Sequence, residues 1–248
     1  METINLTYEE GVAVLMLNRP HKRNAVNRAM ISELKGALDD IRSSTEVKAM
    51  VLTAEGPEAF CAGGDLKELH GDLTEEEAYS VLTPMREVLY NIATLPVPTL
   101  AYLNGSAQGG GCELASACDL RYGKNDDYYG FIQGSLGIVP GWGGGVLLQE
   151  RIGASEAMNW LIRSEMISSE QAHRIGWLQK ITEEEDYFFL KKMSPEQLLF
   201  WKTQILSRMD VEKLHGRMVQ ETLQAAKLWE SEMHKEAVRA FFNGRRGQ

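Results

Sequence analysis

The sequence predicts an α/β fold in which buried strands alternate with helices. Three segments, 12–17, 48–54 and 99–103, are apolar along almost their whole length, which is typical of strands covered on both faces. Between the first two, Met30 and Leu34 begin a series of apolar residues at three- and four-residue spacing, as on the buried side of a helix. The alternation of the two patterns along the chain indicates the α/β class.

The secondary structure can be assigned in chain order from these patterns and from turn and cap signals. Strands are expected at 4–8, 12–17, 48–54, 99–103 and 119–122, with the first two forming a hairpin that turns at Glu10-Gly11. Helices are expected from Asn27, from about 74 to 94, at 112–118, 143–163 and 168–176, and through most of the chain after 194. A capping box at 74–77 marks one helix start, and Pro84 predicts a kink or a break in that helix.

A change in composition divides the chain into two parts. After residue 182 acidic and aromatic residues follow one another (TEEEDYFF), and the sequence beyond them has mainly helical periodicity. We interpret residues 1–182 as the core of the fold. Residues 183–248 are interpreted as a C-terminal helical region that serves packing and oligomerisation.

Charge and composition exclude several classes of function. The 26 Lys and Arg against 35 Asp and Glu give a formal net charge of −9, so the chain lacks the basic face of a nucleic-acid binder. The first residues do not follow a signal-peptide pattern, and no run of 18 apolar residues predicts a membrane span. Cys61, Cys112 and Cys118 suit a reducing compartment, and no metal-ligand spacing occurs. We therefore expect a cytoplasmic protein that binds neither membrane nor metal.

Two glycine-containing segments follow directly after buried strands, at 60–66 and 104–114. Their small residues let backbone N–H groups approach a ligand, and the second segment also opens a helix, whose N-terminus favours negative charge. Neither a P-loop nor a dinucleotide-binding pattern is met. The loops are either packing devices or the two halves of an oxyanion hole. Glu113, in the first turn of the helix, either faces the same ligand or is a dipole partner.

Four motifs in order carry a resemblance to a known family. They are Asn18-Arg19-Pro20 with Asn24-Ala25, the segment 60–66, the segment 96–119, and Gly137-Ile138-Val139-Pro140-Gly141-Trp142-Gly143-Gly144. With these motifs the chain resembles the enoyl-CoA hydratase/isomerase (crotonase) superfamily. The resemblance implies a crotonase-like spiral of ββα units with a helical C-terminal region, assembled as a homotrimer or a dimer of trimers. It also implies an acyl-CoA thioester substrate and no cofactor beyond the coenzyme A of that substrate.

The resemblance assigns roles to particular residues. The backbone N–H groups of Gly64 and Gly110 would form the oxyanion hole that holds the enolate-like oxygen of the thioester. Residues implied in coenzyme A binding are Lys22, Arg23, Ala62, Asp65, Leu66 and Lys67, with Arg245 and Arg246 as further cations that could reach the phosphates. Each of these cations could equally be a solvated surface residue. Their clustering would explain how an acidic protein holds an anionic ligand.

One position departs from the family pattern. Hydratases of this family use two glutamates, one at Glu113 and one at the position occupied here by Gln133, which cannot transfer a proton near neutral pH. We therefore expect Glu113 to be the sole carboxylate acid/base and Gln133 to position substrate or water. Isomerisation of a double bond, or decarboxylation of a methyl- or ethylmalonyl-CoA, would need one such group.

Two further alternatives concern the same region. The segment 131–144 resembles the branch that contains ethylmalonyl-CoA decarboxylases, in which Trp142 has a counterpart. We expect Trp142 itself to serve packing. A non-catalytic acyl-CoA-binding member of the fold is the alternative from another class of function.

Overall fold

The chain folds as a spiral in which strands alternate between a large and a small sheet. The computed structural model describes residues 1–69, 72–184 and 187–244. The large sheet contains, in spatial order, β1 (Ile4–Glu9), β2 (Val12–Leu17), β3 (Ala49–Ala54), β5 (Thr99–Leu103), β7 (Leu120–Gly123) and β10 (Lys180–Ile181). The small sheet contains β4 (Ala59–Cys61), β6 (Ser106–Gln108), β8 (Tyr128–Gly130) and β9 (Ile167–Ser168). Only the pairs β1–β2 and β8–β9 are antiparallel among these strands.

Each turn of the spiral consists of one strand from each sheet followed by a helix. Successive turns are β3, β4 and α3 (Glu75–Ala93), then β5, β6 and α4 (Gly110–Ala117), then β7, β8 and α5 (Gly144–Ile152). The first turn has the same order, with β2, an isolated bridge from Val26 to Gly64, and α1 (Arg28–Ser43). The expected ββα spiral is therefore confirmed. Short elements between these are η1 (Pro20–Lys22), α2 (Leu66–Leu69) and η2 (Ile132–Leu136).

The helix starts follow the local signals in the sequence. The side chain of Asn27 accepts a hydrogen bond from Met30 N at 3.0 Å and caps α1. Thr74 and Glu77 form the expected capping box of α3. The helix then continues through Pro84, so the predicted break does not occur. Leu82 and Met85 on either side are buried in the core, and this packing holds the helix together despite the missing N–H group.

The region expected as one helix at 143–163 forms two. They are α5 and α6 (Ala154–Arg163), and they are separated by Gly153, whose φ of 82° lies in the left-handed region. A helix cannot continue through such a residue, and glycine adopts this conformation without a steric penalty. The expected helix at 168–176 is α7 (Ser169–Arg174).

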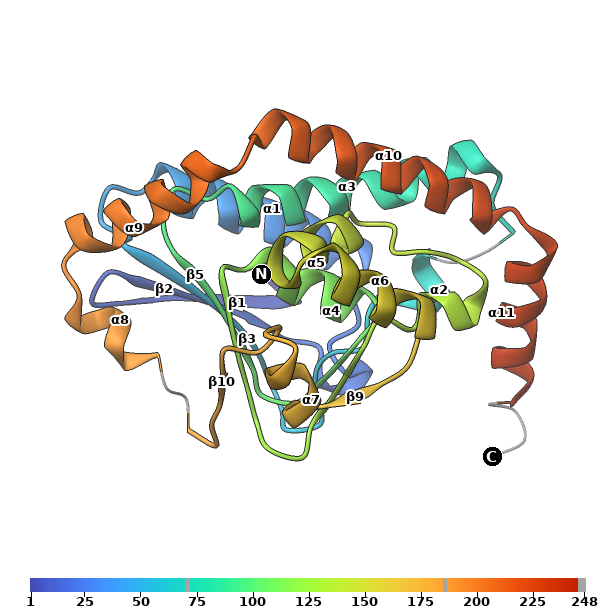
Figure 1. Cartoon of the computed structure of the whole chain (residues 1–248), viewed down its shortest axis with the longest axis horizontal. Helices are drawn as coiled ribbons and strands as arrows, with labels where there is room; N and C mark the ends of the chain where they lie inside the picture. Colours follow the sequence, from blue (N-terminus) through green and yellow to red (C-terminus); the bar gives the residue numbers. More distant parts are fainter. Residues whose placement is uncertain (70–71, 185–186, 245–248) are drawn as a thin grey trace.

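The C-terminal helices lie on both sides of the large sheet, on one side outside the helices of the spiral (Figure 1). They are α8 (Phe188–Lys192), α9 (Pro195–Arg208), α10 (Val211–Trp229) and α11 (Glu232–Gly244). Helix α10 runs along α3 on one face, and α8 and the start of α9 lie over the other (Figure 1). There, Tyr187, Leu190 and Leu198 pack in a cluster with strand residues such as Val51 and Tyr102. The strands are thus buried on both faces, as their apolar sequences predict. The boundary at residue 182 and the role in oligomerisation stay predictions.

Within the described ranges 1–69, 72–184 and 187–244, no helix is long and apolar enough to cross a membrane.

A buried ion pair fastens α9 to the core. Lys202 is 1% exposed, and its Nζ lies 2.8 and 2.7 Å from the two carboxylate oxygens of Asp119, which follows α4. The same ammonium donates to the carbonyl of Ala93 at the end of α3. Asp119 also accepts a hydrogen bond from Thr99 N at the start of β5. One ion pair thereby joins a C-terminal helix to two helices and a strand of the spiral.

We expect Lys202→Met to lower the free energy of unfolding by about 3 kcal/mol, because it leaves Asp119 buried without its main partner. Arg151, at 3.9 Å from Asp119, offsets only part of the loss. Denaturant unfolding followed by circular dichroism measures the change. Lys213→Met on the exposed side of α10 is the matched control and should change stability little. Equal stability of the two variants would contradict the structural role of the pair.

Candidate functional site

The two glycine loops lie in direct contact at the ends of β4 and β6. A side chain at Gly63 would place its Cβ 3.0 Å from the carbonyl oxygen of Gln108 and 3.2 Å from the amide nitrogen of Gly110. Gly63 also has a φ of 91°, which other residues rarely adopt. Both requirements select glycine here. Because β4 and β6 are parallel neighbours, the fold brings together loops that are more than 40 residues apart in sequence.

The amide groups of Gly64 and Gly110 are free donors. Neither N–H group donates a hydrogen bond to another residue within the part of the chain that the structure describes. Gly110 is the first residue of α4, so its N–H also belongs to a helix N-terminus. Both residues line a pocket of about 460 Å³. Two such donors can hold an oxygen that carries developing negative charge.

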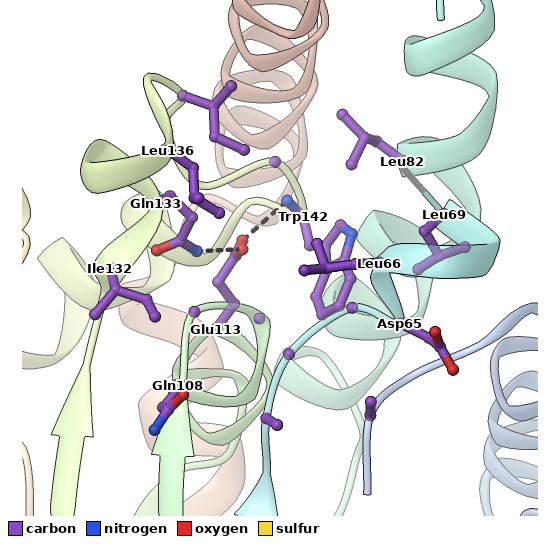
Figure 2. Close-up of a pocket in the computed structure, with 18 of the residues that line it drawn as sticks. Asp65, Leu66, Leu69, Leu82, Gln108, Glu113, Ile132, Gln133, Leu136 and Trp142 are labelled. Carbon is purple, nitrogen blue, oxygen red and sulfur yellow. Dashed lines mark hydrogen bonds between the residues drawn. The ribbon is translucent and has the colours of Figure 1, made fainter. Parts of the chain in front are cut away.

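Glu113 extends from the first turn of α4 into the same pocket (Figure 2). Its carboxylate accepts three hydrogen bonds, and the residue is only 3% exposed. One oxygen, Oε2, accepts from the backbone N–H groups of Trp142 at 2.9 Å and Gly144 at 3.0 Å. The other, Oε1, accepts from Gln133 Nε2 at 2.9 Å. Besides Asp65, Glu113 is the one carboxylate among the described residues of the pocket wall.

Burial sets the protonation behaviour of Glu113. Removal from water raises the pKa of Glu113 to about 7, and the hydrogen bonds from Trp142, Gly144 and Gln133 oppose the rise. A carboxyl group with a pKa in this range can take up and release a proton near neutral pH. The family resemblance predicts Glu113 as a residue of the site, and the structure shows that its burial is the cause of the raised pKa.

Gln133, in η2, is also buried, with 8% of its surface exposed. Its Nε2 donates to Glu113, and its Oε1 has no partner among the described residues. The side-chain amide of Gln133 therefore holds the Glu113 carboxylate with its nitrogen and leaves its oxygen available as an acceptor. Such an acceptor can bind a water molecule or a hydroxyl group of a substrate. The expected juxtaposition of Gln133 and Glu113 is present in the structure.

Trp142 forms part of the pocket floor, in addition to the packing role expected from the sequence. A Cβ at Gly110 would overlap the indole ring of Trp142, and a Cβ at Gly64 would lie 3.5 Å from its Cζ2 atom. The ring therefore packs against both loops that carry the amide donors. Trp142 is 5% exposed and lines the pocket. No signal in the sequence indicated that this side chain would contact both glycines.

The residues implied in coenzyme A binding gather at one side of the pocket. All six of Lys22, Arg23, Ala62, Asp65, Leu66 and Lys67 line it. The three cationic side chains are exposed, whereas the Asp65 carboxylate is paired with Arg19 at 3.1 Å. The loop that carries the first two cations is fixed by Asn24, whose amide donates to the carbonyls of Glu55 and Ala59. Arg245 and Arg246 lie outside the described residues.

The opposite part of the pocket is apolar. Figure 2 shows Leu69 and Leu82 across from Ile132 and Leu136, with Glu113 between these walls. The cationic or potentially cationic side chains among the described lining residues are His21, Lys22, Arg23 and Lys67, which come from the loop after β2 and from α2. The apolar part therefore offers no described cation to an acyl chain. Among the residues that the structure describes, no cluster of three potential metal ligands occurs.

A second carboxylate, which no signal in the sequence indicates, lies behind Glu113. Glu221, on α10, accepts hydrogen bonds from the backbone N–H groups of Gly145 at 3.1 Å and Val146 at 2.8 Å. It is 108 residues from Glu113 in the sequence, and no spacing or motif connects the two. Only the packing of α10 against α5 brings it to this position.

Comparisons with known proteins agree with the geometry. Residues 7–242 match the enoyl-CoA hydratase/isomerase family. The mitochondrial methylglutaconyl-CoA hydratase of Mus musculus is 34% identical over 174 residues, which are 70% of this chain and 55% of that protein. The crotonyl-CoA hydratase of Syntrophomonas wolfei is 34% identical over 185 residues, 75% of this chain and 71% of that protein.

The fold is also shared with solved structures. Enoyl-CoA hydratase from Bacillus halodurans superposes with a TM-score of 0.87 over 96% of this chain and 99% of that chain, at 24% sequence identity. The alignments with the methylglutaconyl-CoA hydratases of Mus musculus and Homo sapiens cover 55% and 51% of those proteins, so this chain spans about half their length.

Two free amide donors beside a buried carboxylate define the class of the protein: an enzyme with a pocket suited to an oxyanion. The chain belongs to the enoyl-CoA hydratase/isomerase family, because the family match covers nearly its whole length.

We expect the pKa of Glu113 to rise above about 7 in Gln133→Met, because the variant removes a donor that stabilises the carboxylate. Titration of the Glu113 side-chain carboxyl by ¹³C NMR measures this, and the resonance is assigned by its loss in Glu113→Gln. Ser135→Ala, in the same 3₁₀ helix, is the control and should leave the titration unchanged. An unchanged or lower midpoint in Gln133→Met would show that the hydrogen bond does not stabilise the ionised form.

Proposed function

We propose that this protein binds acyl-CoA thioesters and moves a proton from the second to the fourth carbon of the acyl chain, with Glu113 as the acid/base. The observation that carries the proposal is the pairing of Glu113 with the amide of Gln133 beside two free backbone donors. The site then contains one group that can transfer a proton and one that can only accept or donate a hydrogen bond. This composition suits the shift of a double bond in an enoyl-CoA.

The proposed reaction begins with ionised Glu113. It removes a proton from the carbon next to the thioester of a 3-enoyl-CoA, and the electron pair moves onto the thioester oxygen. The N–H groups of Gly64 and Gly110 hold this oxyanion, and each such donor contributes about 3–4 kcal/mol of transition-state stabilisation. Protonated Glu113 then returns the proton to the fourth carbon, which gives the 2-enoyl-CoA. Atoms and charge balance without a second acid or base.

Hydration would require two proton-transfer functions in the site. Addition of water needs activation of the water and delivery of a proton to the neighbouring carbon. Gln133 Oε1 can orient a water molecule but cannot remove its proton. Crotonyl-CoA hydration is therefore proposed to be slow compared with isomerisation, although a similar protein from Syntrophomonas wolfei is named a crotonyl-CoA hydratase.

Decarboxylation of a malonyl-type thioester is the second candidate. The apolar part of the pocket supports it, because no cation among the described lining residues there would stabilise the substrate carboxylate. Loss of carbon dioxide would leave an enolate on the same two donors, and protonated Glu113 would deliver a proton to the carbon. Products formed from crotonyl-CoA, a 3-enoyl-CoA, methylmalonyl-CoA and ethylmalonyl-CoA, followed by mass spectrometry, distinguish the reactions. Binding without turnover of all four would support a non-catalytic acyl-CoA binder.

Coenzyme A is proposed to lie along the cationic side of the pocket. Lys22, Arg23 and Lys67 are exposed there and can pair with phosphate groups, and Ala62, Asp65 and Leu66 line the same pocket. The exposed positions of the cations support this role. A homotrimer or dimer of trimers and the absence of a further cofactor are proposed from the family resemblance. A cytoplasmic location is proposed from the three free cysteines, which suit a reducing compartment.

We expect Gln133→Glu to increase the rate of crotonyl-CoA hydration by about 100-fold, since it supplies the second proton-transfer group. The rate is measured from the loss of enoyl absorbance. Gln133→Met removes the amide without adding a carboxylate, so it should not gain hydration activity. Equally fast hydration by the original protein would contradict the proposed role of Gln133.

We expect Glu113→Gln to lower the turnover of the active substrate by about 10²- to 10⁴-fold, because it removes the proton-transfer group. The dissociation constant of a non-reactive acyl-CoA, measured by calorimetry, should change less than about threefold, because coenzyme A binding lies elsewhere in the pocket. Unchanged turnover would remove Glu113 from the mechanism.

A further inference from the structure

The side chain of Trp229 lines the pocket from the corner between α10 and α11. Helix α10 ends at Trp229, and α11 begins at Glu232 and continues in a different direction (Figure 1). Ser231 fixes the corner, because its hydroxyl donates to the carbonyl of Leu228 at 2.6 Å and accepts from the backbone N–H of His234 at 3.3 Å. Trp229 is 4% exposed, so its ring is almost completely enclosed.

One side of this corner is attached to α3, which carries one apolar wall of the pocket. A Cβ at Gly141 would lie 3.0 Å from Leu82 of α3 and 3.4 Å from Ala225, one turn before the end of α10. Leu82 therefore lies beside the last turns of α10. At the corner itself, Glu230 Oε2 accepts a hydrogen bond from the backbone N–H of Glu75, the first residue of α3, at 3.1 Å.

The other side of the corner is attached to η2, which carries the opposite wall. His234 of α11 donates from Nδ1 to the carbonyl of Leu136 at 2.8 Å. The imidazole also packs edge-on against the indole of Trp229, with 5.3 Å between the ring centroids. Next to Leu136, Gly137 leaves room for Met233, since a Cβ there would lie 2.9 Å from Met233 Cγ. Trp229 is thus held against η2 through His234.

The corner therefore joins the two apolar walls. Leu82 and Leu136 lie on opposite sides of the pocket (Figure 2). A thioester oxygen on the N–H groups of Gly64 and Gly110, with coenzyme A on the cationic side, leaves the space between these walls for the acyl chain. A chain that extends between the walls meets the indole ring of Trp229.

We infer that Trp229 is a specificity-determining residue: its indole ring closes the apolar end of the pocket and limits the length of the acyl chain that the site accepts. Short chains fill the space up to the ring, and longer chains must displace it. Displacement is unfavourable because the ring is packed against His234 and belongs to the same buried cluster as Leu82. The inference rests on the proposed binding of acyl-CoA, but not on which reaction follows.

The test is the dissociation constant of saturated straight-chain acyl-CoAs, from butanoyl-CoA to decanoyl-CoA, measured by calorimetry. These compounds have neither the double bond nor the malonyl carboxylate that the proposed reactions need. In the original protein the affinity should rise about fourfold per buried methylene, until the chain reaches Trp229, and fall beyond that length. In Trp229→Ala the rise should continue, so that the first chain beyond this limit gains about tenfold in affinity relative to butanoyl-CoA.

Leu228→Ala is the matched control, because Leu228 is the neighbouring residue on α10, is 37% exposed and does not line the pocket. It should leave the limiting chain length unchanged. Trp229→Phe provides a second variant if Trp229→Ala does not fold. It keeps an aromatic ring but shortens the side chain, and it should move the limit towards longer chains. Circular dichroism checks that each variant is folded.

The outcomes separate this inference from the proposed function. The same limiting length in the Trp229 variants and the original protein would overturn the inference, as would an affinity that rises without a limit in the original protein. An equal loss of affinity at every chain length would also overturn it, because it indicates only a structural role. Absence of binding at every length in the original protein would contradict the proposed function as well. A limit that moves in a protein that converts no acyl-CoA would support the inference and favour a non-catalytic binder.

Discussion

The site depends on the close approach of the first turn of α4 to the first turn of α5. This contact puts the Glu113 carboxylate against backbone donors of α5, and it is possible only because Gly144 has no side chain. The same approach removes Glu113 from water and thereby raises its pKa. It also carries Trp142 over Gly110, so that the floor of the pocket and its acid are fixed by one contact.

An acidic protein can hold an anionic oxygen because the relevant positive charge is local. The net charge of −9 is distributed over the whole chain, whereas the free N–H groups of Gly64 and Gly110 act within hydrogen-bonding distance. These donors add no formal charge to the surface. They do require particular residues in the loops, since two loops this close together leave no room for a side chain at Gly63 or at Gly111.

Features with a local cause could be predicted from the sequence, and features with a distant cause could not. The apolar strands, the cap at Asn27 and the capping box at Thr74 each depend on a few neighbouring residues. The strands of the small sheet have two or three residues each, too few to show a periodicity, and they were missed. The family resemblance predicts that Glu113 and Gln133 belong to one site, but not the hydrogen bond between them, and Glu221 reaches α5 only through tertiary packing.

The spiral has a consequence for how such a site can diversify. Its second turn supplies Gly64, the third supplies Gly110 and Glu113, and the connection to α5 in the fourth supplies Gln133. The first amide donor, the second donor with the carboxylate, and the side-chain amide therefore come from three separate segments of the chain. A substitution in one segment leaves the backbone of the others in place. Exchange of a single side chain, as at position 133, can therefore change the chemical groups of the pocket while the backbone donors of Gly64 and Gly110 stay in place.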